Sequence, residues 1–134
     1  MDLLDQLRLD YQRFPADQSY HLYAEAVYFK DPLTAFRGVK QYQAMIAFMA
    51  HWFRSIHLDL HQIEYASPQE IHTRWTLSWV APLPWQPAMA ISGHSQLQLD
   101  PAGKIIAHID HWDCSPWAVF RQLWRSTKQP SSPF

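Results

Sequence analysis

Residues 88–113, AMAISGHSQLQLDPAGKIIAHIDHWD, predict two neighbouring strands joined by a tight turn. Apolar and polar residues alternate from 88 to 99, which is the period of a half-buried strand, and residues 104–113 predict a last strand. Between them, Asp100-Pro-Ala-Gly103 places a glycine where a tight turn requires a positive φ angle. The two strands are therefore expected to pair antiparallel.

The same alternation continues upstream. Residues 73–79, TRWTLSW, predict another strand with its aromatic residues on one face. Before it, Leu58 and Leu60 alternate with polar residues, whereas Ile63 and Tyr65 continue the pattern on the opposite parity. A β-bulge near residues 61–62 would bring both halves onto one face, because a bulge inserts one extra residue. The second half of the chain is thus predicted to be a run of antiparallel strands.

The first half of the chain has helical spacing. Asp2 is a suitable cap for a helix that stops before Pro15. Asp17 is expected to start a shorter helix, and residues 27–32 an extended run closed by a proline turn. A third helix follows Gly38, with one apolar face made by Val39, Tyr42, Met45, Ile46, Met49, Trp52 and Phe53.

A short last helix is predicted to begin at Ser115-Pro116, a cap followed by a first-turn proline. Helices followed by strands indicate the α+β class, with N-terminal helices packed on a strongly curved, mostly antiparallel sheet and a pocket between the layers. The resemblance described below implies that this architecture is a cone-shaped α+β barrel. We expect a single domain over residues 1–127 and a flexible C-terminal tail over residues 128–134.

Composition narrows the function. The chain has 134 residues, with 11 basic and 12 acidic side chains, and a net charge of -1 argues against nucleic-acid and anionic-membrane partners. The single cysteine, Cys114, excludes an internal disulfide and any multi-cysteine metal site. Acidic residues near the start do not fit a signal peptide, so a cytoplasmic location is expected. Residues 75–99 lack charges but contain three prolines and alternate, so they indicate strands, not a membrane span.

Three segments resemble a known superfamily: YAEAVYFKDP (23–32), FRGVKQYQAMIAFM (36–49) and DPAGKIIAHIDHWD (100–113). Their order is similar to the nuclear transport factor 2-like superfamily, which includes ketosteroid isomerases, limonene epoxide hydrolase and SnoaL-type polyketide cyclases. More closely, the chain resembles an uncharacterised cone-fold group found in photosynthetic organisms. The resemblance covers about residues 3–125 and implies the cone fold. It does not specify an activity, because this scaffold hosts unrelated functions.

The resemblance also implies site residues. Asp31 matches the position of the general base in ketosteroid isomerases, and Trp112 matches a pocket tryptophan, which would turn His108 and Asp110 inward on the same strand face. Asp110 also falls where the epoxide hydrolase keeps a catalytic aspartate.

Several positions depart from both catalytic patterns. The second aspartate of the isomerases would fall near Ser95, and their tyrosine has only a loose counterpart in Tyr11. The arginine–aspartate pair of the hydrolase would fall on Arg74 and Thr76. Neither catalytic set is complete.

The residues themselves favour acid–base chemistry, with a structural alternative for each. Asp31, at the edge of an apolar pocket, would have a raised pKa suited to a general base, or it would only cap the turn before the following helix. His108 and Asp110, two residues apart on one strand, are spaced for a hydrogen bond that orients the imidazole. That pair would equally serve as a structural polar network.

Cofactors and metals are not predicted. His108-x-Asp110 is half of a 2-His-1-carboxylate iron site, but the other histidines are scattered without ligand spacing. The three glycines stand alone at positions 38, 93 and 103, so no glycine-rich phosphate loop exists for a nucleotide cofactor.

The sequence thus predicts a pocket for a small, apolar, oxygen-bearing ligand. Asp31, His108 and Asp110 are the candidate catalytic residues. The predicted ligand-binding residues are Tyr11, Phe29, Met45, Met49, Trp75, Leu77, Ser95 and Trp112. In an enzyme, Asp31 would move a proton, His108 oriented by Asp110 would donate one, and Ser95 or Tyr11 would steady the oxygen.

The alternative is a non-catalytic ligand-binding or assembly module. Polar residues line the other face of strand 73–79, so that face is either solvated or the interface of a homodimer formed through the sheet; these residues are His72, Arg74, Thr76 and Ser78.

Overall fold

Four long antiparallel strands make most of the sheet in the computed structural model, which describes residues 1–124. They are β3 (Arg54–Ser67), β4 (Glu70–Val80), β5 (Ala88–Leu99) and β6 (Ile105–Trp112). The three strands predicted over 73–79, 88–99 and 104–113 are confirmed, and so is the turn between the last two. In that turn Asp100 Oδ1 accepts hydrogen bonds from the backbone N–H groups of Ala102 and Lys104, both at 2.9 Å, and Gly103 has a φ of 87°.

Two further strands complete a six-stranded open sheet in the order β2-β1-β6-β5-β4-β3. β1 (Tyr23–Lys30) runs parallel to β6, and β2 (Ala35–Arg37) is antiparallel to β1. The helix predicted from Asp17 is wrong, because only Tyr20–Leu22 form a 3-10 turn (η1) before β1 begins. Tyr23 and Val27, four residues apart, share a face in a helix and in a strand alike. Pairing with β6 therefore decides the conformation.

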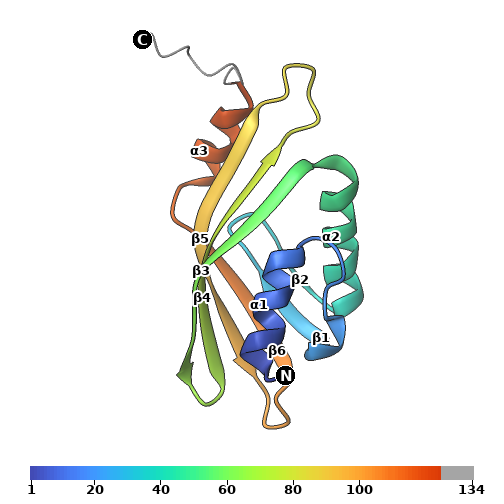
Figure 1. Ribbon diagram of the computed structural model, residues 1–134, viewed down its shortest axis with the longest axis vertical. Helices are drawn as coiled ribbons and strands as arrows, with labels where there is room; N and C mark the ends of the chain where they lie inside the picture. Colours follow the sequence, from blue (N-terminus) through green and yellow to red (C-terminus); the bar gives the residue numbers. More distant parts are fainter. Residues whose placement is uncertain (125–134) are drawn as a thin grey trace.

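The helices pack against the concave side of the curved sheet (Figure 1). α1 (Leu3–Arg13) is capped by Asp2, whose carboxylate accepts from Asp5 N–H at 2.8 Å, and α2 (Val39–Trp52) follows Gly38. α3 (Pro116–Arg121) starts at the predicted cap Ser115 and continues into the 3-10 turn η2 (Gln122–Trp124). In Figure 1, α3 lies at the end of the sheet opposite the β5–β6 turn. The predicted tail, residues 128–134, lies outside the described residues.

The core follows from this layering. Leu7 of α1 packs with Val27 of β1 and Ile105 of β6, while Ile46 of α2 packs with Phe29. The predicted bulge is confirmed by a register shift between β3 and β4 at residues 60–62. Such a bulge increases local twist and bends the strand, which contributes to the curvature that separates sheet and helices.

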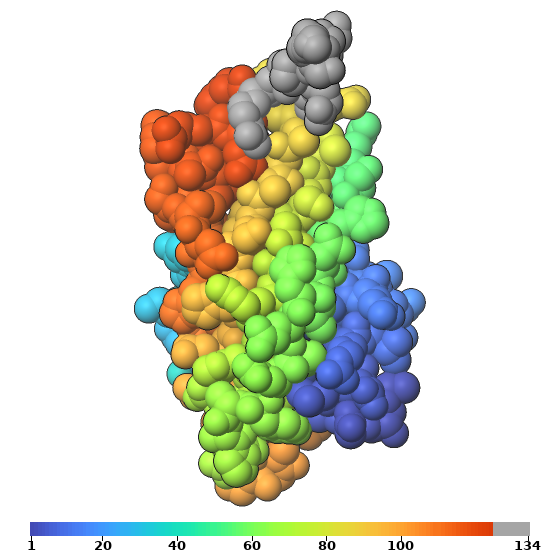
Figure 2. Space-filling model, turned by 60° about the vertical axis from the view of Figure 1, so that its left-hand side comes forward, coloured from blue at the N-terminus to red at the C-terminus, as the bar shows by residue number. Residues whose placement is uncertain are grey.

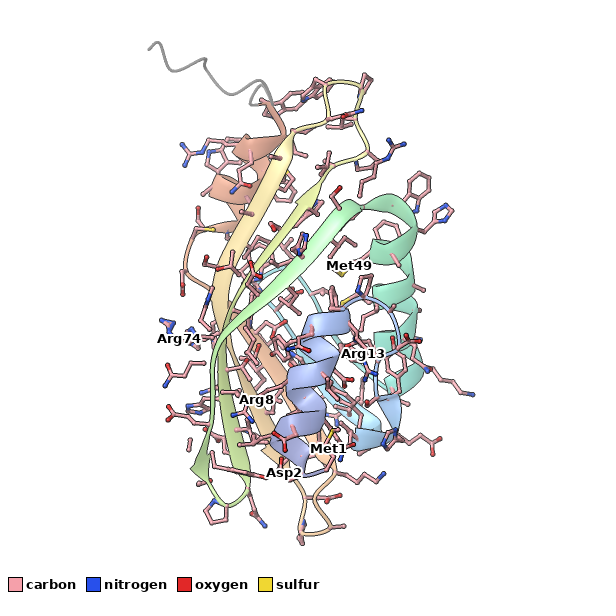
Figure 3. All side chains as sticks on the ribbon, viewed as in Figure 1. Met1, Asp2, Arg8, Arg13, Met49 and Arg74 are labelled. Atoms are coloured by element: carbon pink, nitrogen blue, oxygen red, sulfur yellow. The ribbon has the colours of Figure 1, made fainter. Side chains whose placement is uncertain are left out.

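The opposite face of the sheet is polar. Figure 2 shows β3, β4 and β5 as a surface that no helix covers, and Arg74 points away from the helices in Figure 3. Thr76 Oγ1 bonds to His61 Nε2 at 2.7 Å and to Ser92 Oγ at 2.9 Å, while the rings of His94 and His111 stack with centroids 4.8 Å apart. This face thus satisfies many of its own polar groups. Within residues 1–124, no helix combines the length and apolar character required to cross a bilayer.

Candidate functional site

A cavity of about 610 Å³ lies between the concave face of the sheet and the helices. Its wall is mostly apolar, and Met49 of α2 points into the space between α2 and the sheet (Figure 3). The structure brings all eleven predicted site residues together on this one cavity: Tyr11, Phe29, Asp31, Met45, Met49, Trp75, Leu77, Ser95, His108, Asp110 and Trp112. Their roles are taken up below as proposals.

Hydrogen bonds across three strands build a polar cluster on the cavity floor. The register places Thr73 of β4, Ser95 of β5 and Asp110 of β6 side by side. Trp75 Nε1 donates to Ser95 Oγ at 2.8 Å, and Ser95 Oγ donates in turn to Asp110 Oδ1 at 2.5 Å. The hydroxyl proton of Ser95 is therefore directed at Asp110, so Ser95 does not present a donor to the cavity.

His108 completes the cluster from two residues away on β6. Its Nε2 lies 2.8 Å from Asp110 Oδ1, and its ring is surrounded by Phe29, Tyr42 and Tyr23, with centroids 5.1, 5.6 and 6.3 Å away. Its Nδ1 is buried and has no hydrogen-bond partner in the described chain. An N–H at Nδ1 would be an unsatisfied buried donor, whereas a proton on Nε2 is donated to Asp110 Oδ1, so the geometry favours an Nε2–H donor.

The two carboxylate oxygens of Asp110 differ. Oδ1 receives both donors, Ser95 Oγ and His108 Nε2. Oδ2 makes no hydrogen bond within residues 1–124, and it is not among the buried side-chain atoms that lack a partner. Because Asp110 lines the cavity, Oδ2 is the oxygen that a bound molecule can reach.

Tyr11 approaches the same cluster from α1. Its hydroxyl lies 2.9 Å from Thr73 Oγ1, and burial raises its pKa, with a smaller upward contribution from the negative charge of Asp110. Sequence reasoning missed Thr73, Tyr23 and Tyr42 as members of the site. Thr73 lies two residues before Trp75 on the same strand face, so the alternation of the strand could have indicated it. Tyr23 falls in the segment that was wrongly predicted to be a helix, so its position beside the cavity could not be predicted.

Asp31 has the turn role that the sequence left open. Its Oδ1 accepts hydrogen bonds from the backbone N–H groups of Leu33 and Thr34, both at 2.8 Å. Burial at the cavity edge nevertheless raises its pKa, against the lowering effect of those two bonds, and the charge of Asp110 raises it further. The residue thus combines a structural function with a carboxylate that is partly desolvated.

Gly93 permits the close packing above the cluster. A side-chain Cβ at this position would lie 2.2 Å from the carbonyl oxygen of His111 and 3.0 Å from the Trp75 ring. Glycine therefore allows the indole of Trp75 to cross β5 and reach Ser95. No group of three or more His, Cys, Asp or Glu side chains within residues 1–124 is arranged to hold a metal ion.

Comparison with solved structures identifies the fold. A hypothetical protein with a ketosteroid isomerase-like fold from Catenulispora acidiphila DSM 44928, in complex with trimethylamine, superposes with a TM-score of 0.70 at 12% identity, covering 89% of each chain. An NTF2-like protein of unknown function from Exiguobacterium sp. 255-15 gives 0.68 at 14% identity, covering 84% of this chain and 98% of the other. An LEH-like epoxide hydrolase from Mycobacterium tuberculosis gives 0.64 at 16% identity, covering 92% and 87%.

These similarities show the nuclear transport factor 2-like fold, as the sequence segments predicted, and at such low identity they show nothing more specific. No curated protein has a significant sequence match to the chain. The model of one protein family, described as "Uncharacterized conserved protein (DUF2358)", matches residues 1–108. The chain therefore belongs to the DUF2358 family, with the cone-shaped α+β fold of the nuclear transport factor 2-like proteins.

Proposed function

We propose that the domain binds a small, mostly apolar molecule that carries a hydroxyl group, and that Asp110 accepts the hydrogen bond of this group. The observation that carries the proposal is the carboxylate of Asp110, fixed through Oδ1 by Ser95 and His108, with Oδ2 left unbonded in an apolar cavity. Oδ2 is accessible from the cavity and accepts no hydrogen bond from the protein, so it can accept one from a ligand hydroxyl. A hydrogen bond to a carboxylate is stronger than one between neutral groups.

The rest of the cavity suits such a ligand. A volume of about 610 Å³ lies within the usual range of roughly 300–1,000 Å³ for small-molecule sites. Phe29, Met45, Met49 and Leu77 provide apolar wall, and the flexible methionines can adapt to ligand shape. One protein of the same fold was solved with a small molecule, trimethylamine, which supports ligand binding as a use of this scaffold.

Acid–base catalysis is the second candidate function. It is favoured by two carboxylates, Asp31 and Asp110, that line one cavity in different environments, with the pKa of Asp31 raised by burial. In this scheme Asp31 takes up a proton from the substrate. Tyr11 steadies the substrate oxygen, because the Ser95 hydroxyl already donates its hydrogen bond to Asp110. His108 holds Asp110 in place. An epoxide hydrolase-like protein of the same fold supports the reaction class without specifying a substrate.

A pair of fluorescent probes tests the binding proposal. 2-Naphthol and naphthalene differ by one hydroxyl, so their affinity ratio measures the net contribution of that group, the hydrogen bond less its desolvation. Because a hydrogen bond to a charged group contributes about 1.5–3 kcal/mol, the protein is expected to prefer 2-naphthol by roughly 10-fold or more.

The Asp110→Asn variant should lose most of this preference, whereas Asp113→Asn, at an exposed carboxylate just after β6, should keep it. Equal affinities for the two probes in the unmodified protein would overturn the proposal. Circular dichroism would check that both variants remain folded.

A further inference from the structure

Exposed aromatic side chains gather around the opening of the cavity. Five exposed residues of the cavity wall mark this mouth: Leu33 and Thr34 of the β1–β2 loop, Phe48 of α2, Pro82 of the β4–β5 loop and Phe120 of α3. Seven of the ten large apolar side chains exposed in residues 1–124 lie on these elements or directly beside them, and these seven are Leu33, Phe48, Trp52, Trp85, Trp117, Phe120 and Trp124.

The tryptophans of this patch are unusually open to solvent. Trp117 and Trp124 are 67% and 75% exposed, and the rings of Trp85 and Trp124 stack with centroids 5.8 Å apart. Neither Trp117 nor Trp124 lines the cavity, so ligand enclosure does not explain them. Contiguous exposed apolar surface of this kind marks an interaction site.

The segments around the mouth carry basic but no acidic side chains. Segments 32–58, 81–87 and 114–124 contain no aspartate or glutamate, but they contain Arg54 and Arg121, each within four residues of an exposed tryptophan. Two carboxylates border these segments. Asp31 is half-buried and accepts hydrogen bonds within its own turn, and the exposed Asp113 lies 3.8 Å from His94 Nδ1 on the polar face of the sheet. The net charge of -1 therefore does not show the local excess of basic residues at this end.

We propose that this end of the molecule docks on an anionic lipid bilayer, with the cavity mouth facing the acyl chains. Tryptophan side chains favour the membrane interface, and arginines are attracted to anionic headgroups. If the mouth faces the acyl chains, the apolar wall of the cavity is continuous with the apolar interior of the bilayer, so an apolar ligand can pass between them. This proposal rests on the proposed function and adds that the hydroxyl-bearing ligand is exchanged with the membrane. It replaces the expectation, drawn from net charge alone, that the protein has no membrane partner.

Vesicle co-sedimentation tests the docking. The 134-residue chain is expected to bind vesicles of phosphatidylcholine mixed with phosphatidylserine, and to bind pure phosphatidylcholine vesicles more weakly. The double variant Trp117→Ala, Trp124→Ala should bind at least tenfold more weakly. Arg54→Gln and Arg121→Gln should each cost roughly fivefold, because one basic residue near an anionic surface contributes about 1 kcal/mol.

Tyr65→Ala is the matched control, since Tyr65 is an exposed aromatic residue near the far end of β3. Binding that is absent in the unmodified protein, or equally weakened by Tyr65→Ala, overturns the proposal. Dimerisation that the double tryptophan variant abolishes, without vesicle binding, would assign the patch to a second copy of the chain and also overturn it.

The 2-naphthol titration separates the two proposals. The double tryptophan variant should bind 2-naphthol within about twofold of the unmodified protein, because neither tryptophan lines the cavity. Vesicle binding with no preference for 2-naphthol would leave the docking intact and refute the ligand proposal.

Discussion

Replacing Ser95 with alanine tests the polar cluster most sharply. Ser95 is buried and connects Trp75 Nε1, 2.8 Å away, to Asp110 Oδ1, 2.5 Å away. Its removal leaves the indole N–H without an acceptor, which costs about 1–3 kcal/mol, and removes one of two donors to the carboxylate. We expect a total loss of about 2–4 kcal/mol, a large part of the roughly 5–15 kcal/mol that stabilises a typical domain.

Thermal unfolding followed by circular dichroism measures this loss as a Tm decrease of roughly 6–16 °C for a domain of this size. Ser92→Ala is the control on the same strand, because the Ser92 hydroxyl lies on the exposed face and bonds Thr76. Its effect should stay within about 0.5 kcal/mol. A double-mutant cycle with Trp75→Phe should show a coupling above about 0.5 kcal/mol. If Ser95→Ala were as mild as Ser92→Ala, the cluster would not be a buried hydrogen-bonded network.

Three other perturbations have defined outcomes. Gly93→Ala should lower the yield of folded protein or cost at least about 3 kcal/mol in urea unfolding, because its Cβ would lie 2.2 Å from a backbone carbonyl oxygen. An unchanged urea midpoint of unfolding would refute this packing. Asp31→Asn keeps an acceptor for both turn bonds and removes a desolvated charge. Because burial raises the pKa of Asp31 in the folded state, its ionisation opposes folding as pH rises; the variant should therefore gain Tm at pH 7 and lose that gain near pH 3, and a lower Tm at pH 7 would contradict this. Asp10→Ala should cost about 1–3 kcal/mol, because the buried carboxylate accepts from Ser19 N at 3.1 Å and Ser19 Oγ at 2.8 Å; a loss below 0.5 kcal/mol in chemical denaturation would show that these bonds do not hold the loop.

The strands were predictable because one face of the sheet is buried. Along a strand with one buried face, apolar and polar residues must alternate. This alternation shows which residues share a face with Trp75 and which share one with Ser95, and it shows the change of parity near residue 61. For β6 the resemblance was also needed: it matches Trp112 to a pocket tryptophan, and parity then places Asp110 on the same face. The alternation within one strand does not give the register between neighbouring strands. The contact between Ser95 and Asp110 depends on how β4, β5 and β6 align, and no single strand encodes that alignment.

The failures have equally physical causes. β2 has only three residues, which is too short for any period to be recognised. The helix expected from Asp17 does not form, because the φ of Asp17, 51°, is left-handed, unlike the extended backbone of a helix N-cap. The expectation of no membrane partner stays a prediction that the vesicle experiment tests, because net charge is a sum over the chain and does not show where acidic residues are absent.

A crystal structure of the protein grown with 2-naphthol would show whether the cavity binds a hydroxyl-bearing apolar molecule through Asp110. We expect the naphthyl rings among Phe29, Met45 and Leu77, with the hydroxyl oxygen about 2.5–2.7 Å from Asp110 Oδ2. Naphthol bound outside the cavity, or inside it with the hydroxyl turned away from Asp110, would refute this binding mode.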